Sequence, residues 1–464
     1  MLRASAAAER AGYPTVSIVS TGFLQQAEVV ARGLGLPDMP IAHYPGVPMT
    51  DSVEQLRVKV EQELVPAIIA GISAHDVAKR ARAAESEPAP RDIVFNGTLD
   101  EVNEHFYGKL WSDGLPIIPP TIERVEKFLE FTERAPEQVI GICPPDNREA
   151  TVWNIALTGV MAGCRPEYMP VLIAVIEAVT DPEYRMQDAG STPGWESLVI
   201  VNGPIVKQLD FNYGASVMRV GRQANTSVGR FLRLFLRNLA GFRIAPGAGD
   251  KGSIGQSFLV ALAEDEDSVR DIGWQPFSVE RGFNAGDNIV TVQSVVGISP
   301  PTYSGSEKAI EHARIIAEVI GGSMTYWSPV GLAFGKWHPL LLLGPSIAKV
   351  FAQDGWSKDD LREYLYDNVK MMARDAERYA YYIGLTDFTL ANKVEQGIIP
   401  HVYHDSDDPE RLIPVFPRPG EIGIVVAGDP GRNQSKGYCN NHLQGPPVSK
   451  KVVLPRNWEK LLAR

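Results

Sequence analysis

Apolar runs alternate with helix-like hydrophobic spacing in the first seventy residues. Residues 13–20 form a short apolar run that predicts a buried strand, and a helix is predicted over about 23–34. A second extended segment at 36–45 comes before an amphipathic helix near 53–69. Strand, helix, strand and helix in this order are typical of a parallel α/β unit. We therefore predict a small N-terminal α/β unit over residues 1–83.

A larger α/β domain is predicted over residues 92–464, after a polar, Pro-rich linker at 84–91. Its apolar pattern repeats, with halves at about 139–205 and 295–346. One half opens with Val-Ile-Gly-Ile-Cys-Pro-Pro-Asp and the other with Val-Val-Gly-Ile-Ser-Pro-Pro-Thr, and both later reach a strand that ends in Gly-Pro. The period is too long for a solenoid. It predicts two diverged halves about a pseudo-twofold axis.

Composition then removes several classes of function. The 464 residues include 45 basic and 56 acidic ones, for a net charge of −11, so a nucleic-acid or anionic-membrane partner is not expected. The N-terminus lacks the apolar region of a signal peptide, and the longest apolar runs are too short to cross a membrane. Three cysteines cannot form a disulfide framework. We expect a cytoplasmic protein that forms a homo-oligomer.

The predicted duplication distinguishes the three cysteines from one another. Cys143 aligns with Ser299 and Cys164 with Ser323, so neither position needs sulfur for packing. Cys439 lies in a segment that reads as a polar, mobile loop. Of the three cysteines, only Cys164 has neighbours in the sequence that favour a reactive thiol.

Cys164 precedes an Arg-Pro-Glu segment that is typical of a helix start. Backbone N–H groups there, together with Arg165, are expected to lower the thiol pKa and favour a nucleophilic thiolate. Glu167 or Glu149 would then be the general acid or base. The simpler alternative is a small buried residue in a tight turn.

Residues 219–237 are the most basic part of the chain. Asn225 or Thr226 is predicted to cap a helix in which Arg230, Arg233 and Arg237 share one face. Such a face is usually solvated or paired with acids.

Arg219 and Arg222 precede the start of this helix and, with Asn225, are expected to bind an anionic group of the substrate. Asn154 and Asn202 are further candidates for positioning a small-molecule substrate. The sequence does not identify whether a cofactor is used. We predict no metal site, because His401 and His404 lack zinc-like spacing with a cysteine.

Two stretches of the sequence resemble known families. Residues 12–20 and 34–41 resemble the C-terminal part of the UGSC-type (seleno)protein family, whose motif is selenocysteine or cysteine followed by Gly-Ser-Cys. Much of the remainder resembles an uncharacterised companion family. The segments that carry this second resemblance are 113–121, 143–151, 161–168 and 201–204.

The UGSC resemblance implies redox or thiol chemistry on an α/β domain. Its motif is expected before Gly12, and the sequence does not contain it. The resemblance therefore implies either a second subunit that carries the thiol or selenol, or an N-terminal unit that has lost its redox role. No catalytic residue of the family can be placed on residues 1–83.

Three functions remain open from the sequence. The first is a thiol-dependent enzyme, an oxidoreductase or a lyase, in which Cys164 acts on a small anionic substrate. The second is a lyase or hydrolase in which carboxylates with Asn and Arg do the chemistry and the cysteines are passive. The third is a non-catalytic subunit that works with a separate thiol or selenol protein.

Overall fold

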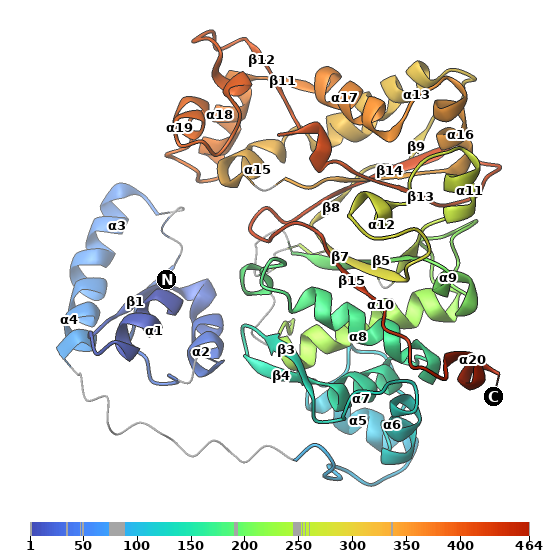
Figure 1. Cartoon of the computed structure of the whole chain (residues 1–464). Coiled ribbons are helices and arrows are strands. Elements are labelled where there is room, and N and C mark those ends of the chain that lie inside the picture. Colours follow the sequence, from blue (N-terminus) through green and yellow to red (C-terminus); the bar gives the residue numbers. More distant parts are fainter. Residues whose placement is uncertain are drawn as a thin grey trace.

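The computed structural model describes residues 2–33, 36–46, 48, 51–73, 89–189, 194–244, 252, 254, 255, 257, 258, 260–335 and 337–463. Its N-terminal unit (Figure 1) contains two strands, β1 (Ser17–Ser20) and β2 (Ile41–Tyr44), which pair in parallel with Ser17 opposite Ile41. The helices of this unit are α1 (Leu2–Arg10), η1 (Thr21–Phe23), α2 (Leu24–Gly33), α3 (Val53–Lys59), η3 (Val60–Leu64) and α4 (Val65–Ser73). The predicted parallel pair is confirmed. Most of the predicted linker lies outside the described residues, and the domain boundaries stay a prediction.

The first sheet of the larger unit has the strand order β15-β7-β5-β6. Its strands are β5 (Glu196–Asn202), β6 (Leu262–Ala263), β7 (Ile289–Val295) and β15 (Val448–Lys451). β5 runs parallel to β6 and antiparallel to β7. The helices packed on this sheet are α7 (Val152–Ala162), α8 (Met169–Val179) and α10 (Gln223–Phe235), which continues as η6 (Leu236–Ala240).

The second sheet has the order β13-β10-β14-β8, with β9 also pairing with β14. Its strands are β8 (Gly297–Ile298), β9 (Thr302–Tyr303), β10 (Leu340–Leu343), β13 (Gly423–Val426) and β14 (Gln434–Cys439). β10 runs parallel to β13 and antiparallel to β14. The helices packed on it include α13 (Ala309–Ile315), η7 (Ile316–Gly321), α16 (Pro345–Gln353) and α17 (Lys358–Asn368).

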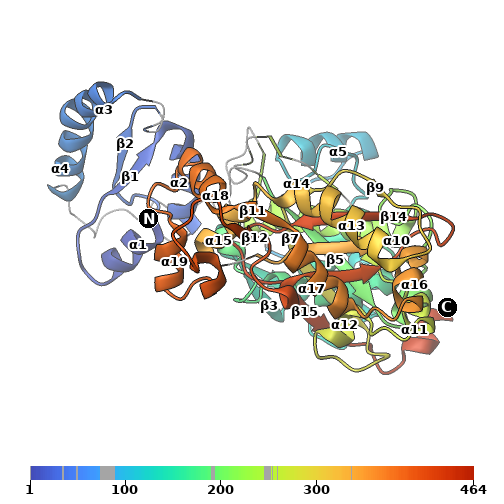
Figure 2. The same ribbon diagram turned by 90° about the horizontal axis from the view of Figure 1, so that it is seen from above.

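The two sheets face each other, and helices cover their outer faces. Leu198 and Ile200 of β5 share a core with Leu340 and Leu342 of β10, which places this core between the sheets. The alternate residues of the same strands pack against α7, α8 and α10 on one side and α13, α16 and α17 on the other. Figure 1 shows these helices outside the strands, and Figure 2, seen from above, shows α13 and α17 lying over the strands. Because side chains alternate along a strand, one apolar run can serve two cores. The fold is a mixed α/β fold, as predicted.

Shorter elements complete the larger unit. A β-hairpin of β3 (Val139–Cys143) and β4 (Arg148–Thr151) leads into α7, and β11 (Lys370–Met372) pairs with β12 (Leu412–Pro414). The remaining α-helices are α5 (Leu99–Gly108), α6 (Ile122–Leu129), α9 (Ile205–Gln208), α11 (Glu266–Asp271), α12 (Phe277–Glu280), α14 (Gly322–Met324), α15 (Ser328–Phe334), α18 (Ala373–Tyr382), α19 (Leu390–Glu395) and α20 (Trp458–Leu462).

The two sheets share a local topology. β6-β5-β7 and β13-β10-β14 have the same order and the same relative directions, and each central strand is followed by a Gly-Pro turn and a helix. The cysteine alignment fits less well, because Cys164 lies in the turn after α7 and Ser323 lies within α14. The duplication stays a prediction.

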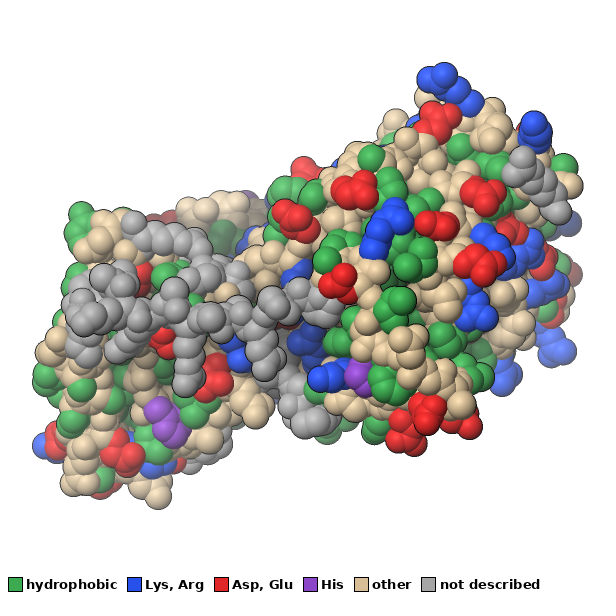
Figure 3. All heavy atoms as spheres, turned by 90° about the horizontal axis from the view of Figure 1, so that it is seen from below, with side chains coloured by type: hydrophobic (Ala, Val, Ile, Leu, Met, Phe, Trp, Pro, Cys, Tyr) green, Lys and Arg blue, Asp and Glu red, His purple; other side chains and the backbone are tan. Residues whose placement is uncertain are grey.

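The surface of the larger unit carries charge of both signs. Figure 3 shows acidic and basic side chains interspersed with hydrophobic ones on one face of the molecule. In the described part of the chain, no helix is both long enough and apolar enough to span a bilayer.

Candidate functional site

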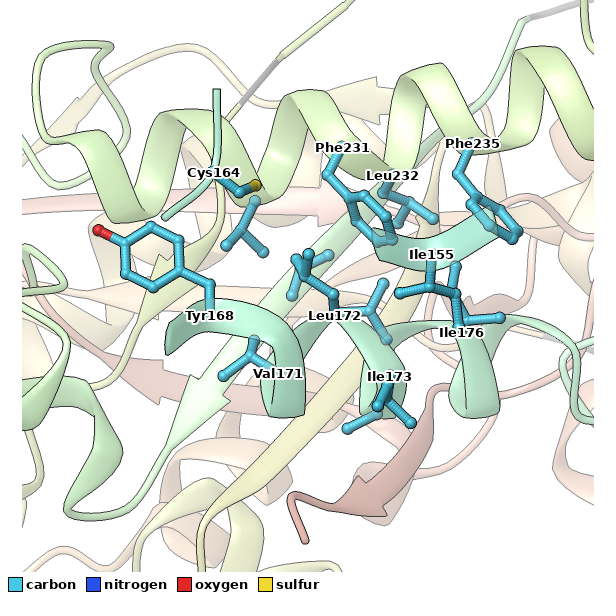
Figure 4. Close-up of a cluster of buried hydrophobic side chains, with 14 of the residues drawn as sticks. Ile155, Cys164, Tyr168, Val171, Leu172, Ile173, Ile176, Phe231, Leu232 and Phe235 are labelled. Atoms are coloured by element: carbon cyan, nitrogen blue, oxygen red, sulfur yellow. The ribbon is translucent and has the colours of Figure 1, made fainter. Parts of the chain in front are cut away.

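Cys164 lies in a short turn that joins two helices of the first core. α7 ends at Gly163, which adopts a left-handed conformation with φ of 80°, and Arg165 caps the short helix η4 (Pro166–Tyr168). The cysteine is therefore one residue before the cap. Its side chain lies among the apolar residues between α8 and α10, near Tyr168 and Phe231 (Figure 4).

The predicted lowering of the Cys164 pKa is wrong for this conformation. Burial raises the pKa of the Cys164 thiol to about 12, and the opposing effects of Ser227 and Arg230 are smaller. Arg165 does not pair with the thiol, because its guanidinium forms an ion pair with Glu167. The basic group and the carboxylate expected to activate Cys164 neutralise each other instead.

The other two cysteines are equally protected. Cys143 is fully buried at the end of β3, and Cys439 lies in β14. The predicted mobile loop around Cys439 is therefore wrong. Burial raises the pKa of both thiols to about 12. The apolar neighbours of Cys439, and its strand partner Gly297 in β8, come from distant parts of the sequence.

We expect all three cysteines to react slowly with iodoacetamide in the native protein near neutral pH. Thiolate is the reactive form, and a thiol with a pKa of about 12 is almost fully protonated there. Mass spectrometry of each alkylated cysteine, with and without denaturant, measures the protection. Rapid native labelling of Cys164 compared with Cys439 would contradict the buried arrangement.

Glu149 and Asn154 lie away from Cys164. Glu149 is exposed on β4, and the Asn154 amide donates to its backbone carbonyl (3.2 Å) near the start of α7. Cys164 follows the other end of this helix, about 15 Å along the axis from Asn154 at 1.5 Å per residue. The structure does not bring these predicted partners of the thiol together with it.

The residues predicted to bind an anion at the start of α10 also have separate roles in the structure. The helix begins at Gln223 with Arg222 as its cap, whereas Asn225 or Thr226 was the predicted cap. Arg222 pairs with Asp210 at 2.9 Å. Asn225 is buried and bonds the backbone of Asn212 and Ala261, so its amide serves packing.

Arg219 is exposed at the surface. Its role in binding a substrate stays a prediction.

Asn202 belongs to a different cluster, at the carboxyl ends of the parallel strands β5 and β6. It is the last residue of β5, and it is fully buried. Its amide nitrogen donates to Glu264 at 2.7 Å and to Glu266 at 3.0 Å, which come just after β6. One amide therefore holds two carboxyl groups together. In α/β sheets, this edge is where ligand sites commonly form.

The two carboxyl groups have different surroundings. Glu264 is buried, and burial raises its pKa despite Lys358 and the N–H donors of Phe277, Asn202 and Val426. Glu266 is partly exposed, and its Oε1 accepts from the Gly203 N–H at 2.8 Å as well as from Asn202. No hydrogen-bond partner of Glu266 Oε2 occurs within the described residues. A neighbouring pair with unlike environments is the usual basis of acid–base chemistry.

Lys358 is the buried cation behind this pair, and it links the two sheets. Its Nζ lies 3.9 Å from Glu264 Oε1 and donates to Glu280 at 3.1 Å. It also donates to the carbonyl of Ile424 in β13 at 3.1 Å. The second sheet thus fixes the carboxyl pair that the first sheet carries.

The described residues contain no group of three or more His, Cys, Asp or Glu side chains arranged to hold a metal ion. His401 and His404 lie in the short helix η8 (His401–His404). His404 Nδ1 accepts a hydrogen bond from Arg411 at 3.2 Å, and its Nε2 lies 3.5 Å from Asp407.

Sequence reasoning found Asn202 but missed Glu264, Glu266 and Lys358. A signal for the two glutamates was present, because an acidic run directly follows the apolar run at 260–263. Acidic side chains after a buried strand indicate a site at a sheet edge. Lys358 gave no such signal, since it reads as an ordinary lysine at a helix start.

Residues 1–74 match the model of the UGSC family. This match covers the N-terminal unit and agrees with the resemblance found there. No curated protein and no solved structure matches the chain. The likeness of the larger unit to a companion family stays a prediction.

Proposed function

We propose that the larger unit is a lyase or hydrolase for a small substrate, and that Glu266 is its general base or acid. The half-exposed carboxylate of Glu266 carries this proposal. Its Oε1 is fixed by Asn202 and the Gly203 N–H, while Oε2 has no partner among the described residues. A carboxylate held by one oxygen can exchange a proton through the other.

The neighbours of Glu266 have supporting roles in this proposal. Asn202 orients the carboxylate, and Glu264 holds Asn202 from behind. The Lys358 ammonium group, 3.9 Å from Glu264 Oε1, limits repulsion between the two carboxyl groups. The cysteines are passive, which agrees with their burial.

A small-molecule conversion screen tests this proposal. The wild-type protein and its variants are incubated with a fractionated metabolite extract, and depletion of each compound is followed by mass spectrometry. We expect Glu266→Gln to slow turnover by about 10²-fold or more, since general acid–base groups contribute 10²–10⁴-fold. Cys164→Ala and Asp271→Asn, an exposed carboxylate of the same helix, should keep the activity.

Two outcomes would reject the proposal. Turnover that is lost in Cys164→Ala and kept in Glu266→Gln would restore the thiol mechanism. No turnover by the wild-type protein, together with a stable complex with a separate thiol or selenol protein, would favour the non-catalytic subunit. The UGSC match over residues 1–74 supports this second candidate, because the resemblance implies thiol or selenol chemistry.

Cellular setting and assembly also belong to the proposal. All three cysteines are free, which fits a reducing cytoplasm. A homo-oligomer remains our expectation, and light scattering of the purified protein would measure it.

A further inference from the structure

A serine and a histidine at the edge of the second sheet are joined by a buried hydrogen bond. Ser304 directly follows β9, and His312 lies in the first turn of α13. The Ser304 Oγ lies 2.6 Å from the His312 Nδ1. His312 is fully buried, whereas Ser304 is 8% exposed. The pair therefore lies just below the surface, at the separation expected of a nucleophile and its general base.

The backbone determines which ring nitrogen of His312 carries hydrogen. The other nitrogen, Nε2, lies 2.8 Å from the carbonyl oxygen of Ser306. A carbonyl oxygen can only accept a hydrogen bond, so Nε2 is the nitrogen that bears hydrogen. In the neutral ring, Nδ1 then has a free lone pair and accepts from the Ser304 hydroxyl. In this tautomer a histidine can take the proton of a serine.

The loop between β9 and α13 holds the orienting carbonyl in place. The Ser306 hydroxyl donates to Glu311 and accepts from the Lys308 N–H, the second bond being 3.0 Å long. The ring of Phe351 in α16 packs against the imidazole of His312, with centroids 6.3 Å apart. The nucleophile, its base and the group that orients the base are therefore all fixed before a substrate arrives, as in hydrolases with an activated serine.

Gly305 provides both space and a hydrogen-bond donor beside Ser304. It is exposed, and apart from its chain neighbours no described atom lies within 4 Å of the position that a β-carbon would take. Its N–H has no acceptor within the described residues. An N–H next to a nucleophilic serine can stabilise the negative charge that develops on an attacked carbonyl oxygen. Tyr303, the residue before Ser304, is 68% exposed and adds an aromatic surface.

We propose that Ser304, activated by His312, is a nucleophile that hydrolyses small carboxylic esters. The Ser304 Oγ forms a bond to the carbonyl carbon while its proton passes to His312 Nδ1. The bond to the alkoxide then breaks, and the departing alcohol takes the proton from His312. Water, deprotonated by His312 in the same way, releases the carboxylic acid and restores the serine. Esters suit this site better than amides because an alkoxide leaves more readily than an amine.

A fluorophosphonate probe tests the proposal, because an activated serine displaces its fluoride and forms a bond to phosphorus. We expect the probe to modify Ser304 in the native protein and not in protein unfolded in urea, with the site mapped by mass spectrometry. Ser357 is the internal control, since it is an exposed serine whose hydroxyl donates to Asp360 at 2.6 Å instead of to a histidine. Ser304→Ala should lose the modification, and His312→Gln should slow it by about 10²-fold or more.

The measurement on the wild-type protein decides the proposal even where a variant fails to fold. No modification of Ser304, or equal modification of Ser304 and Ser357, would overturn it. So would a His312→Gln variant that unfolds at the wild-type Tm and reacts as fast as the wild type. This activity is separate from the role proposed for Glu266, which belongs to the first sheet. Because the probe is read at Ser304 itself, failure here is distinguishable from failure of the Glu266 mechanism.

Discussion

Lys358→Met is expected to lower the free energy of unfolding by about 3–5 kcal/mol, the usual cost of leaving buried carboxylates without their cation. The Lys358 side chain is 3% exposed, and its ammonium group lies between Glu264 and Glu280. Methionine keeps the aliphatic stem and removes the charge. Arg362 continues to pair with Glu280, so losing the Lys358 charge affects mainly Glu264.

Urea unfolding of the wild-type and variant proteins measures this effect. Lys349→Met, an exposed lysine of α16, is the matched control and should change stability by less than about 0.5 kcal/mol. In a Glu264→Gln background, Lys358→Met should cost clearly less, because the carboxylate it serves is gone. An equal cost in both backgrounds would show that Lys358 acts through Glu280 and the backbone carbonyls alone.

The sequence predicts secondary-structure elements better than the contacts between them. The apolar runs of β5 and β10 are visible in the sequence, and so is the order of elements in the N-terminal unit. The local pattern of apolar residues determines these elements. The burial of both faces of β5 and β10 depends on tertiary packing, because the sheets that face each other are built from segments far apart in the sequence.

The site shows the same limit. Glu149 and Arg165 lie near Cys164 in the sequence and were expected to activate its thiol. Helix α7 separates Glu149 from Cys164, and Arg165 forms an ion pair with Glu167 instead. Burial, which raises the thiol pKa, depends on α8 and α10 together. Sequence proximity is a poor guide to electrostatic surroundings for this reason.

The arginine face of α10 was predicted to be solvated or paired with acids, and pairing is confirmed for Arg230 and Arg233. The identity of the acids was not predictable. Asp113 precedes Arg230 by 117 positions. Its carboxylate fits the guanidinium with both oxygens, at 2.8 Å each.

Asp113→Ala is therefore expected to destabilise the protein by about 3 kcal/mol, the lower end of the range for a buried pair that loses one member. Arg230 is 15% exposed and keeps its bond to the Pro116 carbonyl at 2.9 Å, which moderates the loss. Chemical denaturation measures the change. The freed guanidinium also adds positive charge on the arginine face of α10, beside Arg233.

A matched ion pair at the start of the same helix provides the control. Asp210→Ala frees Arg222, but both side chains are more than half exposed, so we expect a change below about 1 kcal/mol. The double variant Asp113→Ala with Arg230→Met should recover part of the stability lost in Asp113→Ala, since methionine needs no counter-charge. Recovery would show that the cost comes from an uncompensated arginine. If the double variant is less stable than Asp113→Ala, the Arg230 bonds to backbone carbonyls matter more than its charge.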